Sequence, residues 1–348
     1  MPRQQRAHGQ QSFADLTLVD LGGPRTAATL ARLDAAVPWD KLVTPIRALP
    51  EYAKYVEDPT RPGQRPIDPL VMVKAMMLQK WYGLSDPQAE EQLKDRISFR
   101  RFVGLAQDDP TPDETTFVVF RARLRAAGLD RTIFDAVLAH VERQGLLVKR
   151  GTVVDATIVE QARGTKTGAK DERGNDRTTR DPGASFTKKH GRSYHGYKLH
   201  AAVDQGSAIV TDLVTSTAKD HDSRYIDELT EDERRAVFAD SAYSDDGRRA
   251  RLSARGVLPG ICYKRVRGQA ELTPFQKKFN RLVAKLRAAG EHPFAWMRRL
   301  MNFTRCRYRG LRRNGFDFTL TAAAYNLKRA ASLLAAAAAR RGPARAAT

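Results

Sequence analysis

Gly151-Thr152-Val153-Val154-Asp155-Ala156-Thr157-Ile158-Val159 is the stretch that decides the fold, because a β-branched run here carries one carboxylate in its middle. Valine, isoleucine and threonine fit a pleated, covered surface, so the run predicts a buried strand. Lys149, Arg150 and Gly151 end the helix expected before it. A charged Asp155 on such a strand needs a partner or a metal ion, since an unpaired buried charge is strongly unfavourable.

The residues before this strand predict helices. Asp68 and Pro69 read as an N-cap and a first-turn proline, and apolar residues then recur at helical spacing until Gly83. Ser85 and Gln88 form a capping-box pattern that begins a second helix. Together with helical segments expected over 26–36, 98–102, 113–127 and 130–144, they predict an all-α domain over residues 1–147.

Several arginines in this helical region suggest that one helix enters a DNA groove, as in helix-turn-helix proteins. A solvated charged face is the simpler alternative, and the sequence names no base-reading residue. The arginines concerned are Arg96, Arg100, Arg101, Arg121, Arg123 and Arg125.

The residues after Asp155 change to a period of two. Residues 197–203 alternate before a turn at 204–206, and the next strand returns over 208–217. Helices over 222–229 and 245–255 then alternate with strands over 235–239 and 257–263. This order is that of an α/β, ribonuclease H-like mixed sheet, which we expect over residues 148–334. The segment 160–193 predicts a flexible basic loop, and 335–348 a basic, alanine-rich tail.

The overall charge points to a polyanionic partner. The chain has 348 residues, enough for about two domains, and a net charge of +20. Such a charge also suits a ribosomal or RNA-binding protein. Cys262 and Cys306 lack the paired spacing of a zinc site or a disulfide framework, so a reducing cytoplasm is expected. No apolar run has the length of a signal or membrane segment, so no membrane partner is expected.

Asp155 and Asp240 are the first candidate site residues. Asp240 ends a predicted strand that can lie beside the strand of Asp155. Two carboxylates held that close raise each other's pKa unless a cation lies between them, and Mg²⁺ or Mn²⁺ prefers such oxygen ligands. Two such ions drive in-line displacement at phosphorus. The alternative is that Asp240 caps a turn and Asp155 pairs with a lysine.

Glu291 is the third candidate, chosen by its context. Arg287 precedes it by four residues and Arg298 follows it by seven, so all three share one face if the helix continues. Pro293 predicts a kink or a restart there. A carboxylate flanked by guanidinium groups suits a site that holds a metal ion and phosphate oxygens. A surface ion pair is the alternative.

Three further residues are candidates for DNA contact. Lys198 and His200 share a strand face and could touch DNA phosphate, with a satisfied strand histidine as the alternative. Tyr243 could stack on DNA near the cleavage point. Packing beneath Asp240 is its simpler role.

The chain resembles bacterial insertion-sequence transposases of the DDE type, nearest the insertion sequence 5 group. The residues that carry the resemblance are Phe13-Ala14-Asp15, Leu84-Ser85-Asp86, Phe99-Arg100-Arg101-Phe102, Val154-Asp155-Ala156-Thr157, Gly196-Tyr197-Lys198-Leu199-His200, Ala239-Asp240-Ser241-Ala242-Tyr243, and Arg287 with Glu291-His292-Pro293-Phe294. The resemblance implies that Asp155, Asp240 and Glu291 bind two Mg²⁺ or Mn²⁺ ions. Around the Glu, Ala284 stands where the family has tyrosine, and Arg298 where it has lysine.

The resemblance also implies a function. We expect a Mg²⁺-dependent DNA transposase that binds the terminal inverted repeats of its element through residues 1–147, cleaves the ends and joins the 3′-hydroxyl to target DNA. Action on two ends suggests a homodimer or larger assembly on double-stranded DNA, at the bacterial nucleoid. One alternative is a nuclease of the same fold without strand transfer, and another is a non-catalytic DNA-binding repressor.

Overall fold

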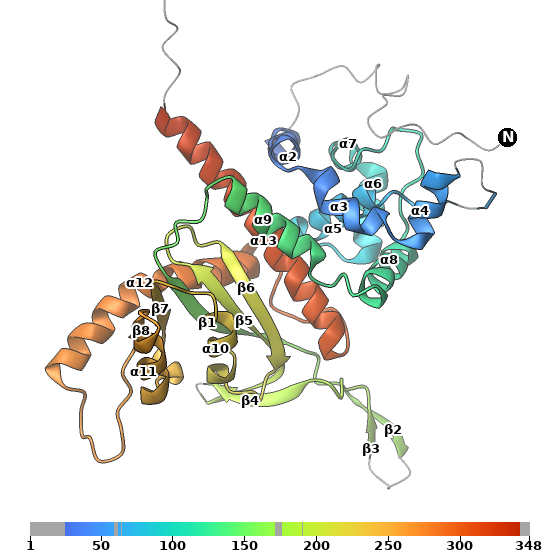
Figure 1. Cartoon of the computed structure of the whole chain (residues 1–348). Coiled ribbons are helices and arrows are strands. Elements are labelled where there is room, and N and C mark those ends of the chain that lie inside the picture. The colour runs from blue at the N-terminus through green and yellow to red at the C-terminus, as the bar shows by residue number, and fades with distance from the viewer. Residues whose placement is uncertain (1–24, 59–61, 64, 171–175, 190, 342–348) are drawn as a thin grey trace, which may run out of the picture. The chain divides into compact units, whose positions relative to one another are not determined.

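The structure, a computed structural model, describes residues 25–341 except 59–61, 64, 171–175 and 190 (Figure 1). It divides into two units: residues up to His140 together with those from Ala330, and Val141–Arg329. The helix α13 (Leu311–Arg341) includes the residues 335–341 that were expected to form a tail. Among the described residues, no helix combines the length and apolar character needed to cross a membrane.

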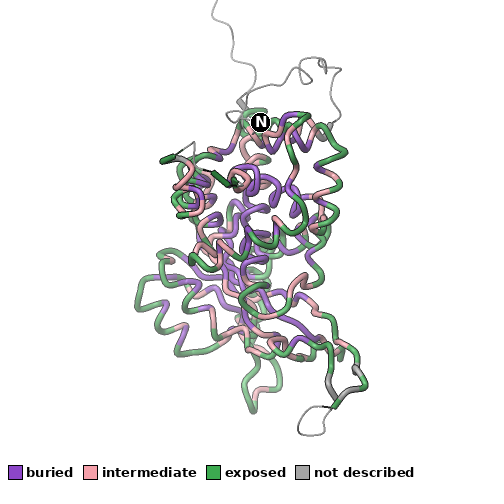
Figure 2. The backbone as a smooth tube through the Cα atoms, turned by 90° about the vertical axis from the view of Figure 1, so that its right-hand side faces the viewer, coloured by how far each residue is buried: buried purple, intermediate pink, exposed green. Residues whose placement is uncertain are grey.

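The described residues of the first unit form helices. α5 is buried along almost its whole length: Asp68 caps it by accepting a hydrogen bond from the Leu70 amide at 2.7 Å, and Gly83 ends it at φ 66°. Ser85 and Gln88 form the expected capping box of α6. Figure 2 shows buried backbone at the centre of this unit and exposed backbone on its outer helices. The bounds are α2 (Arg25–Ala36), α3 (Trp39–Arg47), α4 (Pro50–Glu57), α5 (Pro69–Tyr82), α6 (Asp86–Asp95), α7 (Ile97–Val103), α8 (Glu114–Ala126) and α9 (Thr132–Arg143).

Two arginines that were candidates for DNA contact are instead buried. Arg121 is 4% exposed and donates to Asp86 Oδ1 at 2.9 Å. Arg100 is 5% exposed and donates to the carbonyl oxygens of Gln107 and Asp109 at 3.1 and 2.8 Å. Each guanidinium therefore holds helices or a loop together, because a buried cation requires such partners. The expectation of DNA contact is wrong for both residues.

The second unit is built on a mixed sheet whose main strands run in the order β6-β5-β1-β7-β8, with β4 also on β5. β1 pairs antiparallel with β5 and parallel with β7, and β7 pairs parallel with β8. This arrangement contains the expected strand and helix order and fits a ribonuclease H-like fold. The bounds are β1 (Thr152–Glu160), β4 (Ser185–Lys189), β5 (Arg192–Asp204), β6 (Val210–Thr217), α10 (Ile226–Leu229), β7 (Ala236–Ala239), α11 (Asp246–Ala254), β8 (Leu258–Ile261) and α12 (Pro274–Leu300).

Both faces of the central sheet are covered. On one face, Val154 of β1 and Val237 of β7 pack with Ile226 and Leu229 of α10 and Leu252 of α11. On the other, α12 packs against β1. Residues 195–204 of β5 are buried without interruption, so the strand does not alternate between core and solvent.

The segment 160–193, expected to be a flexible loop, contains strands. β2 (Lys166–Lys170) and β3 (Asp176–Thr178) pair with each other, and β4 joins the main sheet. At the base of this excursion the buried Asp181 accepts hydrogen bonds from Tyr197 Oη, Gln161 Nε2 and the Gly310 amide at 2.8, 3.0 and 2.8 Å. A carboxylate with several donors fixes the base of this excursion, whose composition cannot pack a core.

α12 approaches β1 closely at Gly290. A Cβ on this residue would lie 2.5 Å from Val153 Cγ1 and 4.0 Å from Asp155 Cβ. Only glycine allows the helix backbone to lie at this distance from the strand.

Replacing Gly290 with alanine should lower the free energy of unfolding by about 1–3 kcal/mol, because the added methyl overpacks against a β-branched side chain. Gly315→Ala in α13 is the matched control, since its Cβ would meet Thr215 at an ordinary 3.7 Å. Denaturant unfolding of both variants measures this, and a Gly290→Ala variant as stable as the Gly315→Ala variant would contradict it.

Asp181→Asn should destabilise the fold by about 2 kcal/mol at neutral pH. Burial alone would raise the pKa of Asp181, but the bonds from Gly310, Gln161 and Tyr197 lower it to about 2. The stabilisation is therefore complete above about pH 4 and is lost as the pH falls through about 2. Unfolding curves from pH 2 to 7 should show the two proteins converging in acid, with Glu228→Gln on α10 as the control carboxylate.

Candidate active site

The register of β1 and β7 places Asp155 and Asp240 at the same level. Thr152 pairs with Val237 and Val153 with Phe238, an offset of 85 (237 − 152). The same offset separates Asp155 from Asp240 (240 − 155 = 85). β7 ends at Ala239, so Asp240 leaves the strand beside the part of β1 that carries Asp155. The two strands are neighbours, as the sequence predicts.

Asp155 is a carboxylate whose charge is not fully compensated. Burial raises its pKa to about 6, and Asp240 adds to the rise, while the Ala156 amide, Arg287 and Lys189 oppose it. The Ala156 amide donates to Asp155 Oδ1 at 2.9 Å. A group in this environment gains from a nearby cation, which would return its pKa to lower values.

Asp240 begins the short 3₁₀ turn η2 (Ser241–Tyr243) and caps it. Its Oδ1 accepts a hydrogen bond from the Ala242 amide at 2.8 Å. Tyr243, at the end of this turn, is 1% exposed and packs in the core cluster with Val154 and Val237. The packing alternative for Tyr243 is therefore the one found, and stacking on DNA is not possible in this structure.

α12 carries the third expected carboxylate on the helix that covers Asp155. The helix continues through Pro293 to Leu300, so the chain does not restart a new helix there. Gly290 lies against Val153 and Asp155, and the Arg298 guanidinium contacts Thr157 Oγ1, two residues beyond Asp155 on the same strand face. Glu291 lies between these two contacts along the helix and is exposed.

The structure brings two of the three expected carboxylates, Asp155 and Asp240, side by side. Among the described residues, no group of three or more His, Cys, Asp or Glu side chains is arranged to hold a metal ion. Asp155 and Asp240 supply the hard oxygen donors that Mg²⁺ and Mn²⁺ prefer, and the raised pKa of Asp155 indicates a place for positive charge. The donor chemistry of this pair fits such a cation, and Glu291 does not join the pair in this structure.

Lys198 and His200 lie on the opposite face of the sheet from Asp155. Asp155 pairs with Ala201, whereas His200 is opposite Ala156, and residues directly opposite on antiparallel strands share a face. His200 is fully buried, and burial lowers its pKa, so the ring is neutral at pH 7. It bonds to Ser216 Oγ at 2.8 Å. Direct contact of His200 with DNA phosphate is therefore excluded in this structure.

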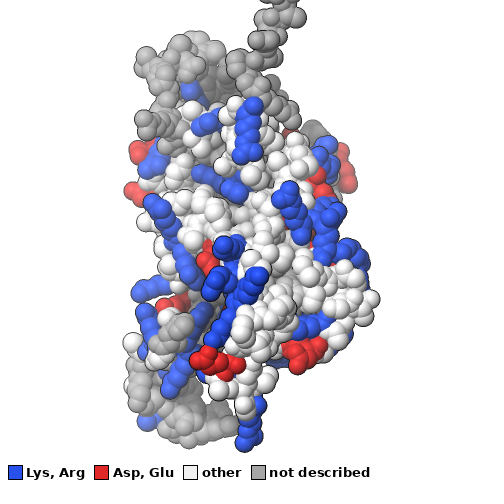
Figure 3. Space-filling view, turned by 90° about the vertical axis from the view of Figure 1, so that its left-hand side faces the viewer, with Lys and Arg blue, Asp and Glu red and all other residues white. Residues whose placement is uncertain are grey.

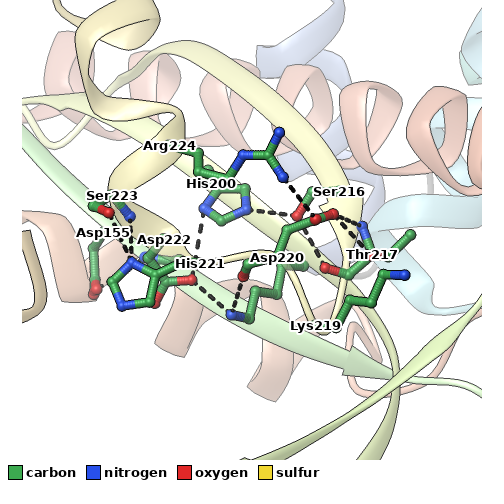
Figure 4. A network of polar contacts seen from close by, with 12 residues as sticks. Asp155, His200, Ser216, Thr217, Lys219, Asp220, His221, Asp222, Ser223 and Arg224 are labelled. Carbon is green, nitrogen blue, oxygen red and sulfur yellow. Dashed lines mark hydrogen bonds and ion pairs between the residues drawn. The ribbon is translucent and has the colours of Figure 1, made fainter.

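Lys198 belongs to a polar network that the sequence did not reveal (Figure 4). Its Nζ forms an ion pair with Asp222 Oδ1 at 2.8 Å and donates to the Asp220 carbonyl oxygen at 2.7 Å. These contacts hold it inside the protein, with 9% exposure, and not on a DNA-facing surface. In the sequence, Asp222 reads only as an acidic residue at the start of a helix, so no signal there marks it.

Family comparison gives the context for this site. Residues 147–327 match the family described as "Transposase DDE domain", and residues 24–123 match "Transposase domain (DUF772)". Among solved structures, the piggyBac transposase synaptic complex with hairpin DNA is 8% identical with a TM-score of 0.47, covering 90% of this chain and 76% of that chain. The Mos1 strand transfer complex is 12% identical with a TM-score of 0.19, covering 77% and 96%.

The first family match spans more than half of the chain and contains Asp155, Asp240 and Glu291. The protein therefore belongs to the DDE transposase family.

Proposed function

We propose that this chain is the transposase of an insertion sequence resembling the insertion sequence 5 group. It binds the terminal inverted repeats of its element, cleaves the ends and joins the freed 3′-hydroxyl to target DNA. One observation supports the proposal above all. The register of the adjacent strands β1 and β7 brings Asp155 and Asp240 side by side, within the segment that matches the DDE family.

In this proposal, Asp155 and Asp240 hold the divalent cations, two Mg²⁺ or Mn²⁺ ions per site, and Glu291 joins them from α12. Divalent cations held by these residues would activate the attacking oxygen and stabilise the leaving oxygen. Asp155 must be deprotonated to act as a ligand, and its raised pKa makes that step dependent on the cation. Arg287 and Arg298, on either side of Glu291, contact phosphate oxygens of the DNA.

The surface charge of the second unit supports DNA as the substrate. The stretch between β8 and the middle of α12 contains seven exposed lysine and arginine residues and one acidic residue, Glu271. The seven are Lys264, Arg265, Arg267, Lys277, Lys278, Arg281 and Lys285. Figure 3 shows a face on which lysine and arginine are more widespread than aspartate and glutamate. Each phosphate contact from such residues releases counterions and strengthens binding. The helical unit binds the element ends, and action on two ends implies a homodimer or larger assembly.

Asp155→Asn should reduce Mg²⁺-dependent cleavage of end-containing DNA by about 1,000-fold or more, because several kcal/mol of charge stabilisation at phosphorus is lost. Glu291→Gln should have the same effect, whereas Glu228→Gln should cleave normally. DNA binding by all three variants should remain, as a gel-shift assay would show. Cleavage by Asp155→Asn at the normal rate would remove its proposed role.

Strand transfer needs its own measurement. Pre-cleaved element ends supplied to the wild-type protein with Mg²⁺ should become joined to target DNA. Products that are only cleaved, never joined, would instead identify a nuclease of the same fold.

Stability should also depend on pH through Asp155. The raised pKa means that between about pH 4 and 6 the folded chain keeps a proton that the unfolded chain has released, so stability falls as the pH rises through this window. Asp155→Asn cannot ionise and should be more stable than wild type by about 2 kcal/mol at pH 7 in chelator, after allowance for partial exposure. Urea unfolding at pH 4 and pH 7 measures this, and an equal difference at both values would contradict it.

A further inference from the structure

A second 3₁₀ turn, η1 (Asp222–Arg224), is fixed beside the turn that begins at Asp240. η1 and η2 are in contact. Arg248 of α11, 7% exposed, bridges them: Nη1 donates to the Tyr243 carbonyl oxygen and Nη2 to the Ser223 carbonyl oxygen, both at 2.9 Å. Its Nε also donates to Asp227 Oδ1 at 2.9 Å. A buried guanidinium with three such acceptors holds the two turns in one arrangement.

Asp222, the first residue of η1, is held at this position. Lys198 reaches it from β5 and forms the 2.8 Å ion pair, while the Asp222 side chain remains 29% exposed. Figure 4 shows Asp222 and Asp155 at the same end of the polar network, beside His221 and Ser223. β7 ends level with Val154, so β7 does not pair with β1 beside Asp155.

A buried hydroxyl lies within the electrostatic influence of these carboxylates. Within the described part of the chain, Tyr243 Oη has no hydrogen-bond partner, although the residue is 1% exposed. Burial raises the pKa of this hydroxyl, and Asp222, Asp155 and Asp240 all raise it further. A buried hydroxyl left unsatisfied costs about 1–3 kcal/mol, so a polar group from outside the chain is expected at this point.

We propose that Asp222, although Lys198 holds it from the face of β5 opposite Asp155, acts on the cation site of Asp155 and Asp240 past the end of β7, through the water shell of the ion. Mg²⁺ keeps several of its waters when it binds carboxylates, so a third acid can act at the site without direct ligation. In this arrangement, one of those waters is also the partner of Tyr243 Oη.

The inference rests on the proposed cation site, so the test is binding of Mn²⁺ to the full-length protein without DNA, measured by calorimetry. Asp222→Asn should weaken Mn²⁺ binding about 10- to 100-fold, the usual effect of removing a group that acts on a metal through another ligand. Glu228→Gln, which removes an exposed carboxylate from the adjoining α10, should bind as wild type does.

Tyr243→Phe provides a second variant that keeps the packing of the ring. It should weaken Mn²⁺ binding several-fold and raise the thermal midpoint of the metal-free protein, because the unsatisfied hydroxyl is removed. This variant decides the inference if Asp222→Asn does not fold.

The outcomes separate the two proposals. Wild-type affinity in both Asp222→Asn and Tyr243→Phe, with binding lost in Asp155→Asn, would overturn the role of Asp222 and leave the proposed function intact. Failure of the wild-type protein to bind Mn²⁺, or undiminished binding by Asp155→Asn, would overturn the cation site itself and this inference with it.

Discussion

The structure of the second unit depends on one constraint, a carboxylate placed on a strand inside a covered sheet. β7 ends one residue before Asp240, so the two acids meet where the sheet no longer pairs. Gly290 lets α12 lie close to that point, and Arg287 brings opposing charge. Folding therefore leaves negative charge in excess at this point, an arrangement that is typical of functional sites.

The sequence predicts the framework because its local signals agree with the final fold. The capping box at Ser85 and Gln88, the stop at Gly83 and the β-branched run around Asp155 depend on residues that are neighbours along the chain. The order of strands and helices follows from such signals added together. It also places Asp155 and Asp240 on adjacent strands, because the topology allows few alternatives.

The remaining features depend on contacts between distant segments. β5 is buried on both faces, so its sequence pattern does not show which side chains lie on the face of Asp155. His200 lies on the opposite face. Arg100 and Arg121 look like other basic residues until their buried acceptors are known. Arg248 joins η1 and η2 to α11, and no spacing along the chain reveals these contacts.

The hydrogen bonds of Asp181 determine whether the β2–β3 excursion can be lengthened without disturbing the main sheet. Gln161 and Asp181 bond at 3.0 Å, so the two ends of the β2–β3 excursion are held together at its base. The entropy of closing a loop grows only slowly with its length. A peptide tag or a fluorophore attachment sequence inserted between β2 and β3 would therefore leave the main sheet intact, which makes this excursion a suitable labelling position.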